Sequence, residues 1–191
     1  MGREFELKFG AEEAQQEAIA AKFGEFRTIT LSATYYDTPD GALSARHITL
    51  RRRLENGVSV CTVKTPGEHG ARGEWELPRE DIMEAIPELC KLGAPAALPQ
   101  WTAGGLVSLC GARFTRRAKQ ISPAGCTVEL ALDRGVLTGG GREVPLCEVE
   151  VELKSGSEEA AVAFADSLAA EFGLKREEKS KFRRASELAN G

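Results

Sequence analysis

Four segments of the sequence alternate between charged and apolar residues at every second position. They are EFELK at 4–8, RGEWEL at 72–77, CTVELALD at 126–133 and CEVEVEL at 147–153. In a β-strand, successive side chains point to opposite faces of the sheet. The alternation therefore predicts strands with one apolar face and one charged face. In a further segment, TLRRR at 49–53, Thr49, Arg51 and Arg53 share a face in the same way.

The rest of the chain supplies further strands and a few helices. Strands are predicted at 28–36, 47–54, 58–65, 72–77, 113–121, 126–137 and 144–153, and helices at 11–23, 79–92, 157–172 and 180–189. Hairpin turns are indicated at Glu55-Asn56-Gly57 and at Gly139–Gly141. The stretch 93–100, which contains two prolines, is predicted as an internal loop. Many strands joined mainly by hairpins are typical of an antiparallel barrel or sandwich with outer helices.

Length and composition restrict the class of protein. The 191 residues suit a single domain spanning 1–191, and a net charge of −4 argues against a nucleic-acid partner. We find no apolar run long enough to cross a bilayer and no secretory signal. The five cysteines form no CxxC pair, which argues against a zinc or disulfide framework. We therefore expect a cytoplasmic protein without membrane or nucleic-acid partners; its oligomeric state is open, a homodimer included.

The alternation permits two arrangements of the charged faces. Either they face water around an apolar core, or they line the inside of a barrel whose apolar faces pack against outer helices. Glu148, Glu150 and Glu152 share one face, and two like charges 4 Å apart repel by about 4 kcal/mol at an effective dielectric constant near 20. A closed interior would need compensating cations. Spacing alone leaves the choice open.

Both signs of charge are available for such an interior. The cations are Lys8, Arg51, Arg53, Lys64, Arg72, Arg116 and Lys181. The anions are Glu4, Glu6, Glu74, Glu76, Glu129, Asp133, Glu148, Glu150 and Glu152. This near balance, together with one or two divalent metal ions, would suit a polyanionic substrate.

An ordered set of motifs resembles a known family. EFELK at 4–8 is followed by YYDTPD at 35–40, LRRR at 50–53, TVK at 62–64, RGEWE at 72–76, VELALD at 128–133, EVEVE at 148–152 and SK at 180–181. In this order they resemble the CYTH superfamily, the triphosphate tunnel metalloenzymes, and most of all its bacterial inorganic triphosphatases. The resemblance extends over essentially the whole chain.

The resemblance implies a fold and an activity. The implied fold is α+β: an eight-stranded antiparallel β-barrel, or tunnel, with a charged interior and flanking α-helices. The implied enzyme uses Mg²⁺ or Mn²⁺ to hydrolyse inorganic triphosphate to pyrophosphate and phosphate by attack of water. Thiamine-triphosphatase and class IV adenylate cyclase are alternatives on the same fold. A non-catalytic polyphosphate-binding module is a third.

The resemblance also assigns roles to residues. The metal ligands would be Glu4, Glu6, Glu150 and Glu152, with Glu150 favoured as the third carboxylate. The substrate-binding cations would be Lys8, Arg51, Arg53, Lys64, Arg72, Arg116 and Lys181, and Lys8, Arg51, Arg53, Lys64 and Arg116 would also serve catalysis. The family pattern favours Arg116 over its neighbours Arg113 and Arg117. Arg52 is expected to point outward and Glu148 to be structural. Glu74, Glu76, Glu129 and Asp133 would either orient the cations, which is the favoured role for most of them, or bind a second metal ion.

Overall fold

The computed structural model describes residues 2–66 and 72–190 and consists of one long sheet with helices packed against it. The strands are β1 (Gly2–Glu4), β2 (Glu6–Gly10), β3 (Arg27–Asp37), β4 (Thr49–Glu55), β5 (Val58–Thr65), β6 (Arg72–Pro78), β7 (Val107–Ile121), β8 (Cys126–Gly139), β9 (Arg142–Gly156) and β10 (Lys175–Arg176). The helices are α1 (Glu13–Phe23), α2 (Ile82–Lys91), α3 (Leu98–Trp101), α4 (Glu158–Phe172) and α5 (Lys181–Asn190), with a 3₁₀ turn η1 (Ser44–Arg46).

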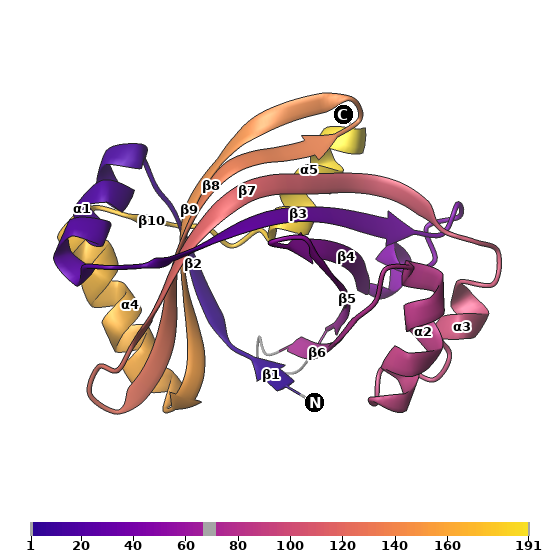
Figure 1. Cartoon of the computed structure of the whole chain (residues 1–191), viewed down its shortest axis with the longest axis horizontal. Coiled ribbons are helices and arrows are strands. Elements are labelled where there is room, and N and C mark those ends of the chain that lie inside the picture. The colour runs from indigo at the N-terminus through magenta and orange to yellow at the C-terminus, as the bar shows by residue number, and fades with distance from the viewer. Residues whose placement is uncertain (1, 67–71, 191) are drawn as a thin grey trace.

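The sheet is antiparallel at every strand pair described. Its strand order is β1-β6-β5-β4-β3-β7-β8-β9-β2-β10. Figure 1 shows it arching from β9 across β3 to β6, with α1 and α4 on one side and α2 and α3 on the other. The predicted combination of an antiparallel sheet with flanking helices is therefore confirmed.

The number of strands differs from the expected eight. In the described part of the chain the sheet has ten strands, because the N-terminal strand is divided at Phe5 and the two-residue β10 is added. β1 pairs with β6 and β2 pairs with β9, while the amide of Leu153 donates to the carbonyl of Phe5 over 2.9 Å. The N-terminal segment thus reaches β6 with one part and β9 with the other.

Most predicted elements occur close to their expected positions. The turn between β4 and β5 has Asn56 at φ 48° and Gly57 at φ 87°, the left-handed conformations that a tight two-residue hairpin requires. The helix predicted from residue 79 begins only at Ile82, because the side chain of Asp81 caps it by accepting from two backbone amides. The loop predicted at 93–100 was wrong in its last part, where α3 begins with a proline in its first turn.

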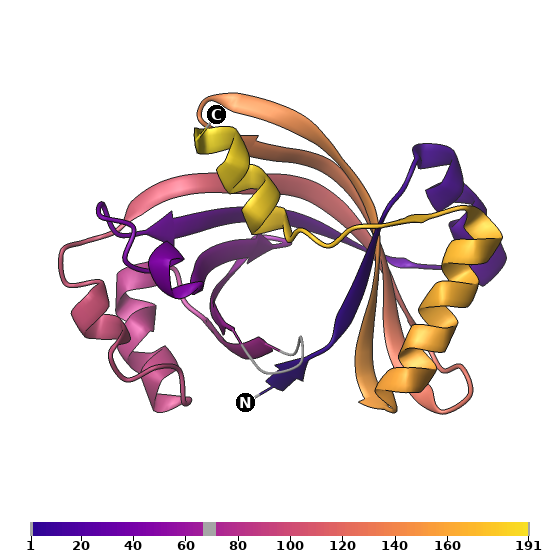
Figure 2. The same ribbon diagram turned by 180° about the vertical axis from the view of Figure 1, so that it is seen from behind.

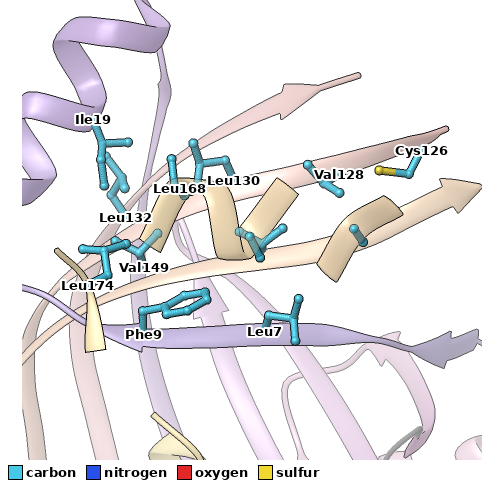
Figure 3. Close-up of a cluster of buried hydrophobic side chains, with 13 residues drawn as sticks. Leu7, Phe9, Ile19, Cys126, Val128, Leu130, Leu132, Val149, Leu168 and Leu174 are labelled. Atoms are coloured by element: carbon cyan, nitrogen blue, oxygen red, sulfur yellow. The ribbon is translucent and has the colours of Figure 1, made fainter. Parts of the chain in front are cut away.

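The apolar faces of β2, β8 and β9 point away from the middle of the arch and pack against α1 and α4. Figure 3 shows this cluster, in which Phe9 and Leu130 from the sheet meet Ile19 of α1 and Leu168 of α4. A second cluster packs the outer side of β4 and β5 against α2 and α3 around Leu50 and Leu89. Since the apolar faces are used here, the charged faces of the same strands are left for the opposite side of the sheet.

Helix α5 is packed differently from the other helices. It lies against β7 and β8 (Figure 2). There Ala185 and Phe182 pack in a cluster that includes Tyr35 and Phe114. A Cβ atom added at Gly139 would lie 2.3 Å from the carbonyl oxygen of Ala185, so only glycine permits this close approach. The packing fixes the first turn of α5, which carries Lys181. None of the described helices is long and apolar enough to span a membrane.

Candidate active site

A cavity of about 330 Å³ is lined by the charged faces of strands from both halves of the sheet. All of the predicted site residues whose side chains the structure describes line it: Glu6, Lys8, Arg51, Arg53, Lys64, Arg116, Glu150, Glu152 and Lys181. The inverted arrangement, with charges inside and apolar faces outside, is the one that these residues adopt. Their individual roles remain predictions.

For two predicted site residues, Glu4 and Arg72, the structure describes the backbone but not the side chain. Glu4 and Arg72 are backbone register partners in the β1–β6 pair. Their side chains lie outside the described part of the structure, so their predicted contacts with metal and substrate remain predictions.

Strand register brings the carboxylates and cations of β2 and β9 together. Glu6 is the register partner of Glu152, and Lys8 is the partner of Glu150. The ammonium of Lys8 donates to Oε1 of Glu6 over 3.1 Å. Since residues that are opposite on adjacent strands project from the same face, all four side chains enter the cavity from one wall.

Arg116 is bound by two carboxylates at this wall. Its Nε and Nη2 atoms donate to the two oxygens of Asp133, each over 2.7 Å, and Nη2 also donates to Glu150. Burial lowers the pKa of the guanidinium, but the charges of Glu150 and Asp133 outweigh it and hold that pKa well above its usual range. Arg116 is therefore held rigidly as a cation. Its neighbours Arg113 and Arg117 pair instead with Glu143 and Glu17.

Lys181 joins the same group of charges from α5. Its ammonium lies 2.7 Å from Glu150 and 2.8 Å from Asp133, and it also pairs with Glu148. Burial lowers the pKa of Lys181, but these carboxylates outweigh it and hold that pKa well above its usual range. For Glu150, burial raises the pKa, yet Lys181 and Arg116 hold it well below its usual range. Both groups are thus ionised.

Behind the cavity wall, Glu148 completes this cluster. It is fully buried and pairs with Arg184 as well as with Lys181. Burial and the charge of Glu150 raise the pKa of Glu148, while Lys181 and Arg184 oppose the change. This agrees with the structural role expected for Glu148. Like Asp133, it lies behind the residues that line the cavity.

The acidic triad of Asp133, Glu148 and Glu150 resembles a metal site in its geometry. One carboxylate oxygen from each lies within 4.8 Å of the others, and all three residues are buried. Three cations, Arg116, Lys181 and Arg184, already contact these oxygens. Buried carboxylates with that many charge partners need no metal for compensation, so we interpret the triad as an ion-pair cluster.

The opposite wall of the cavity, formed by β4, β5 and β6, is paired more loosely. Arg51 lies 3.8 Å and Lys64 lies 3.4 Å from Glu74, and Arg53 lies 3.8 Å from Glu76 and contacts Glu55. The Nε atoms of Arg51 and Arg53 are buried and have no hydrogen-bond partner among the described residues. Burial and the charge of Arg51 lower the pKa of Arg53. The wall thus offers the two Nε donors of Arg51 and Arg53 to an anion.

Some of the residues that form the site were not predicted from the sequence. Arg27, Glu55 and Lys154 also line the cavity. Glu55 and Lys154 continue the alternation of Arg53 and Glu152 by two residues, so the pattern itself contained that signal. Gln16 of α1 gave no signal: it is fully buried and donates to the carbonyls of Asp133 and Glu148, each over 2.9 Å.

Comparison with known proteins gives one family and several relatives. The family model of the CYTH domain matches residues 2–186. An inorganic triphosphatase of Haemophilus influenzae is 30% identical over 149 residues, which cover 75% of this chain and 42% of that protein. This chain therefore spans less than half the length of that relative.

Solved structures share the fold. HpAC1 from Hippeastrum, described as a suggested adenylyl cyclase with a dominant triphosphatase activity, superposes with a TM-score of 0.71 at 17% identity, covering 98% of this chain and 97% of that one. The PH1819 protein of Pyrococcus horikoshii superposes with a TM-score of 0.65 at 23% identity, covering 96% and 98%. At these identities the likeness concerns the fold alone.

Proposed function

This chain belongs to the CYTH domain family, and we propose that it is a divalent-metal-dependent triphosphatase. Its substrate would be inorganic triphosphate, which it would hydrolyse to pyrophosphate and phosphate inside the charged cavity. The observation that carries the proposal is a cavity with loosely paired cations on one wall and carboxylates on the other. The triphosphatase relative at 30% identity supports the choice of substrate.

The loosely paired wall would bind the phosphate chain. Arginine offers a planar fork that matches phosphate oxygens, and lysine offers a compact point charge. Arg51 and Arg53 have buried Nε donors without a partner among the described residues, so phosphate oxygens would complete their hydrogen bonding. Lys64 and Lys8 line the same cavity and would add positive charge.

Glu6 and Glu152, together with Glu4, would hold the metal. The first two face the cavity from adjacent strands at the same register position, and each is about a quarter exposed. Carboxylate oxygens that remain accessible to water and substrate suit Mg²⁺ or Mn²⁺, which usually bind a few carboxylates and the substrate phosphates. A bound ion would neutralise phosphate charge and lower the pKa of a water molecule.

Glu150 is less accessible than Glu6 and Glu152, because Arg116 and Lys181 occupy its oxygens. Phosphate oxygens would compete for these two cations, and Glu150 would then be released toward the metal. The same two cations would stabilise the charge that develops on the substrate during transfer. We propose direct attack by water on the terminal phosphorus, with pyrophosphate as the leaving group.

We also propose that the sheet closes into a tunnel around the substrate. The support is the N-terminal segment, whose β1 pairs with β6 while β2 pairs with β9. A metal ion held by Glu4 of β1 and Glu6 of β2 would then lie where the two ends of the sheet meet. The substrate bound to that ion would contact both walls of the cavity.

A phosphate-release assay tests the function. Inorganic triphosphate, ATP and thiamine triphosphate would be compared at equal concentration with Mg²⁺, with Mn²⁺ and with a chelator. We expect metal-dependent release of phosphate, fastest with inorganic triphosphate. Formation of cyclic AMP from ATP would overturn the hydrolase assignment. Tight binding of triphosphate without turnover under either metal would instead favour a binding module.

A further inference from the structure

Arg184 lies on α5 one turn after Lys181 and does not line the cavity. Its side chain is 20% exposed, and its Nη2 atom contacts Oε2 of Glu148. Its Nη1 atom also lies 3.8 Å from a carboxylate oxygen of Glu177. Among the arginines of α5 it contrasts with Arg183, whose side chain is 68% exposed and pairs with Glu187 on the helix surface.

The two oxygens of Glu148 are divided between two cations. Oε1 accepts from the ammonium of Lys181, and Oε2 accepts from Arg184. By binding Oε2, Arg184 therefore fixes the orientation of the carboxylate, in which Oε1 points to Lys181. With Arg184 removed, both oxygens of Glu148 would be available to the ammonium.

Arg184 supplies one of the three positive charges that contact the three buried carboxylates. Asp133, Glu148 and Glu150 carry three negative charges, and Arg116, Lys181 and Arg184 carry three positive charges. Leaving one buried charge uncompensated is strongly unfavourable, and the remaining groups shift to reduce the imbalance. The group with the freedom to shift is the Lys181 ammonium, because lysine presents a point charge on a flexible chain.

We propose that Arg184 is a positioning residue that, by binding Glu148 behind the cavity wall, holds the ammonium of Lys181 at the cavity. This rests on the proposed function in so far as Lys181 binds the substrate. Without Arg184 the ammonium, which already contacts Oε1 of Glu148, is drawn toward Oε2 as well and turns away from the phosphate chain. Substrate binding then weakens although no residue that touches substrate has been changed.

The position of the ammonium can be measured without any substrate. In protein labelled with ¹⁵N-lysine, the side-chain signal of Lys181 is assigned by its loss in Lys181→Gln. We expect Arg184→Gln to shift or broaden that signal, Arg184→Lys to restore it, and Arg183→Gln to leave it unchanged. An unchanged Lys181 signal in folded Arg184→Gln overturns the proposal. If Arg184→Gln does not fold, Arg184→Met, which keeps the aliphatic part of the side chain and removes the charge, is read in the same way.

The consequence for substrate is tested by a double-mutant cycle. Arg184→Gln is expected to raise the KM for inorganic triphosphate about tenfold with a smaller change in kcat, and Arg184→Lys to recover most of the loss. Lys181→Gln combined with Arg184→Gln should be no worse than Lys181→Gln alone, because the second residue acts through the first. Additive losses would overturn the proposal. A wild-type protein that neither binds nor hydrolyses triphosphate would overturn the proposed function, and the ammonium signal would still decide the role of Arg184.

Discussion

Glu6 on β2 and Glu152 on β9 are register partners, so two carboxylates face the same cavity from neighbouring strands. Lys8 and Lys154 lie beside them at 3.1 Å and 2.7 Å, each paired with the carboxylate on its own strand. Like charges directly opposite each other destabilise an antiparallel pair. A cation bound between the two carboxylates would remove this repulsion.

Neutralising either carboxylate should have opposite effects on the stability of the metal-free protein and on its stabilisation by metal. Without metal, Glu152→Gln should leave the free energy of unfolding unchanged or raise it by up to ~1 kcal/mol, because the repulsion is removed. If the protein binds Mg²⁺ as proposed, the ion at about 100 times its Kd should stabilise the wild-type protein by about 2.7 kcal/mol, and this gain should be largely lost in the variant. Thermal unfolding with and without Mg²⁺ measures both effects. Glu143→Gln, at the exposed start of the same strand, is the control and should keep the full response.

Arg51 and Arg53 should contribute mainly to substrate binding. Each would form a charge-assisted hydrogen bond worth about 1.5–3 kcal/mol, so Arg51→Gln or Arg53→Gln should weaken triphosphate binding roughly ten- to a hundredfold. The strand itself provides a control, because Arg52 lies between them and pairs with Glu80 outside the cavity. Calorimetric titration with triphosphate measures the three variants. An equal loss in Arg52→Gln would show that general charge, and not the cavity wall, determines affinity.

The alternation of the sequence was sufficient to predict which face of each strand carries the site. Arg51 and Arg53 could be assigned to one face because a strand has a side-chain period of exactly two residues, and the structure places both at the cavity. Whether that face was inside or outside could not be predicted from period alone. That required the apolar faces to find partners, which Leu89 of α2 provides for β4 and β5 and which Ile19 and Leu168 provide for β2, β8 and β9.

The sequence could not predict how Arg184 and Gln16, which lie on helices, contact the buried carboxylate residues Asp133 and Glu148. Arg184 reaches Glu148 across 36 residues, and Gln16 reaches Asp133 across 117. Such pairs depend on how α5 and α1 pack against the sheet. The residue periodicity within one segment does not predict which other segment it will contact. The division of the N-terminal strand at Phe5 was missed for the same reason, since it follows from pairing with two different strands.

Gln16 should be important for stability although it lies outside the cavity. Its amide donates to the carbonyls of Asp133 and Glu148, and its oxygen accepts from Arg134 over 3.2 Å. Gln16→Met keeps the approximate volume and removes these hydrogen bonds, so we expect a loss of about 1–3 kcal/mol in the free energy of unfolding. Urea unfolding measures it. Gln100→Met, at an exposed position, should change stability by less than about 0.5 kcal/mol, and a similar loss there would contradict this account.

Asp37 should link the stability of the fold to acidic pH. It is 2% exposed, and its carboxylate accepts hydrogen bonds from the backbone amides of Thr38, Leu43 and Ser44 at 2.7–3.0 Å. Burial raises the pKa of Asp37, but these hydrogen bonds outweigh it and lower that pKa below its usual value. A carboxyl group whose pKa is lower in the folded state than in the unfolded chain stabilises the fold when it is ionised.

The sign of the pH dependence follows from this lowered pKa. The stabilisation from Asp37 is complete above its unfolded pKa, about 3.9, and is lost as the pH falls from there through the lower folded pKa. Asp37→Asn should therefore lower the free energy of unfolding at pH 7 by about 1–3 kcal/mol, because the carboxylate acceptor is lost. The difference between variant and wild type should shrink below about pH 4. Denaturant titrations from pH 7 to pH 3 measure it, with Asp166→Asn on the exposed side of α4 as the control. A difference that stayed constant over this range would mean that the ionisation of Asp37 does not contribute to the fold.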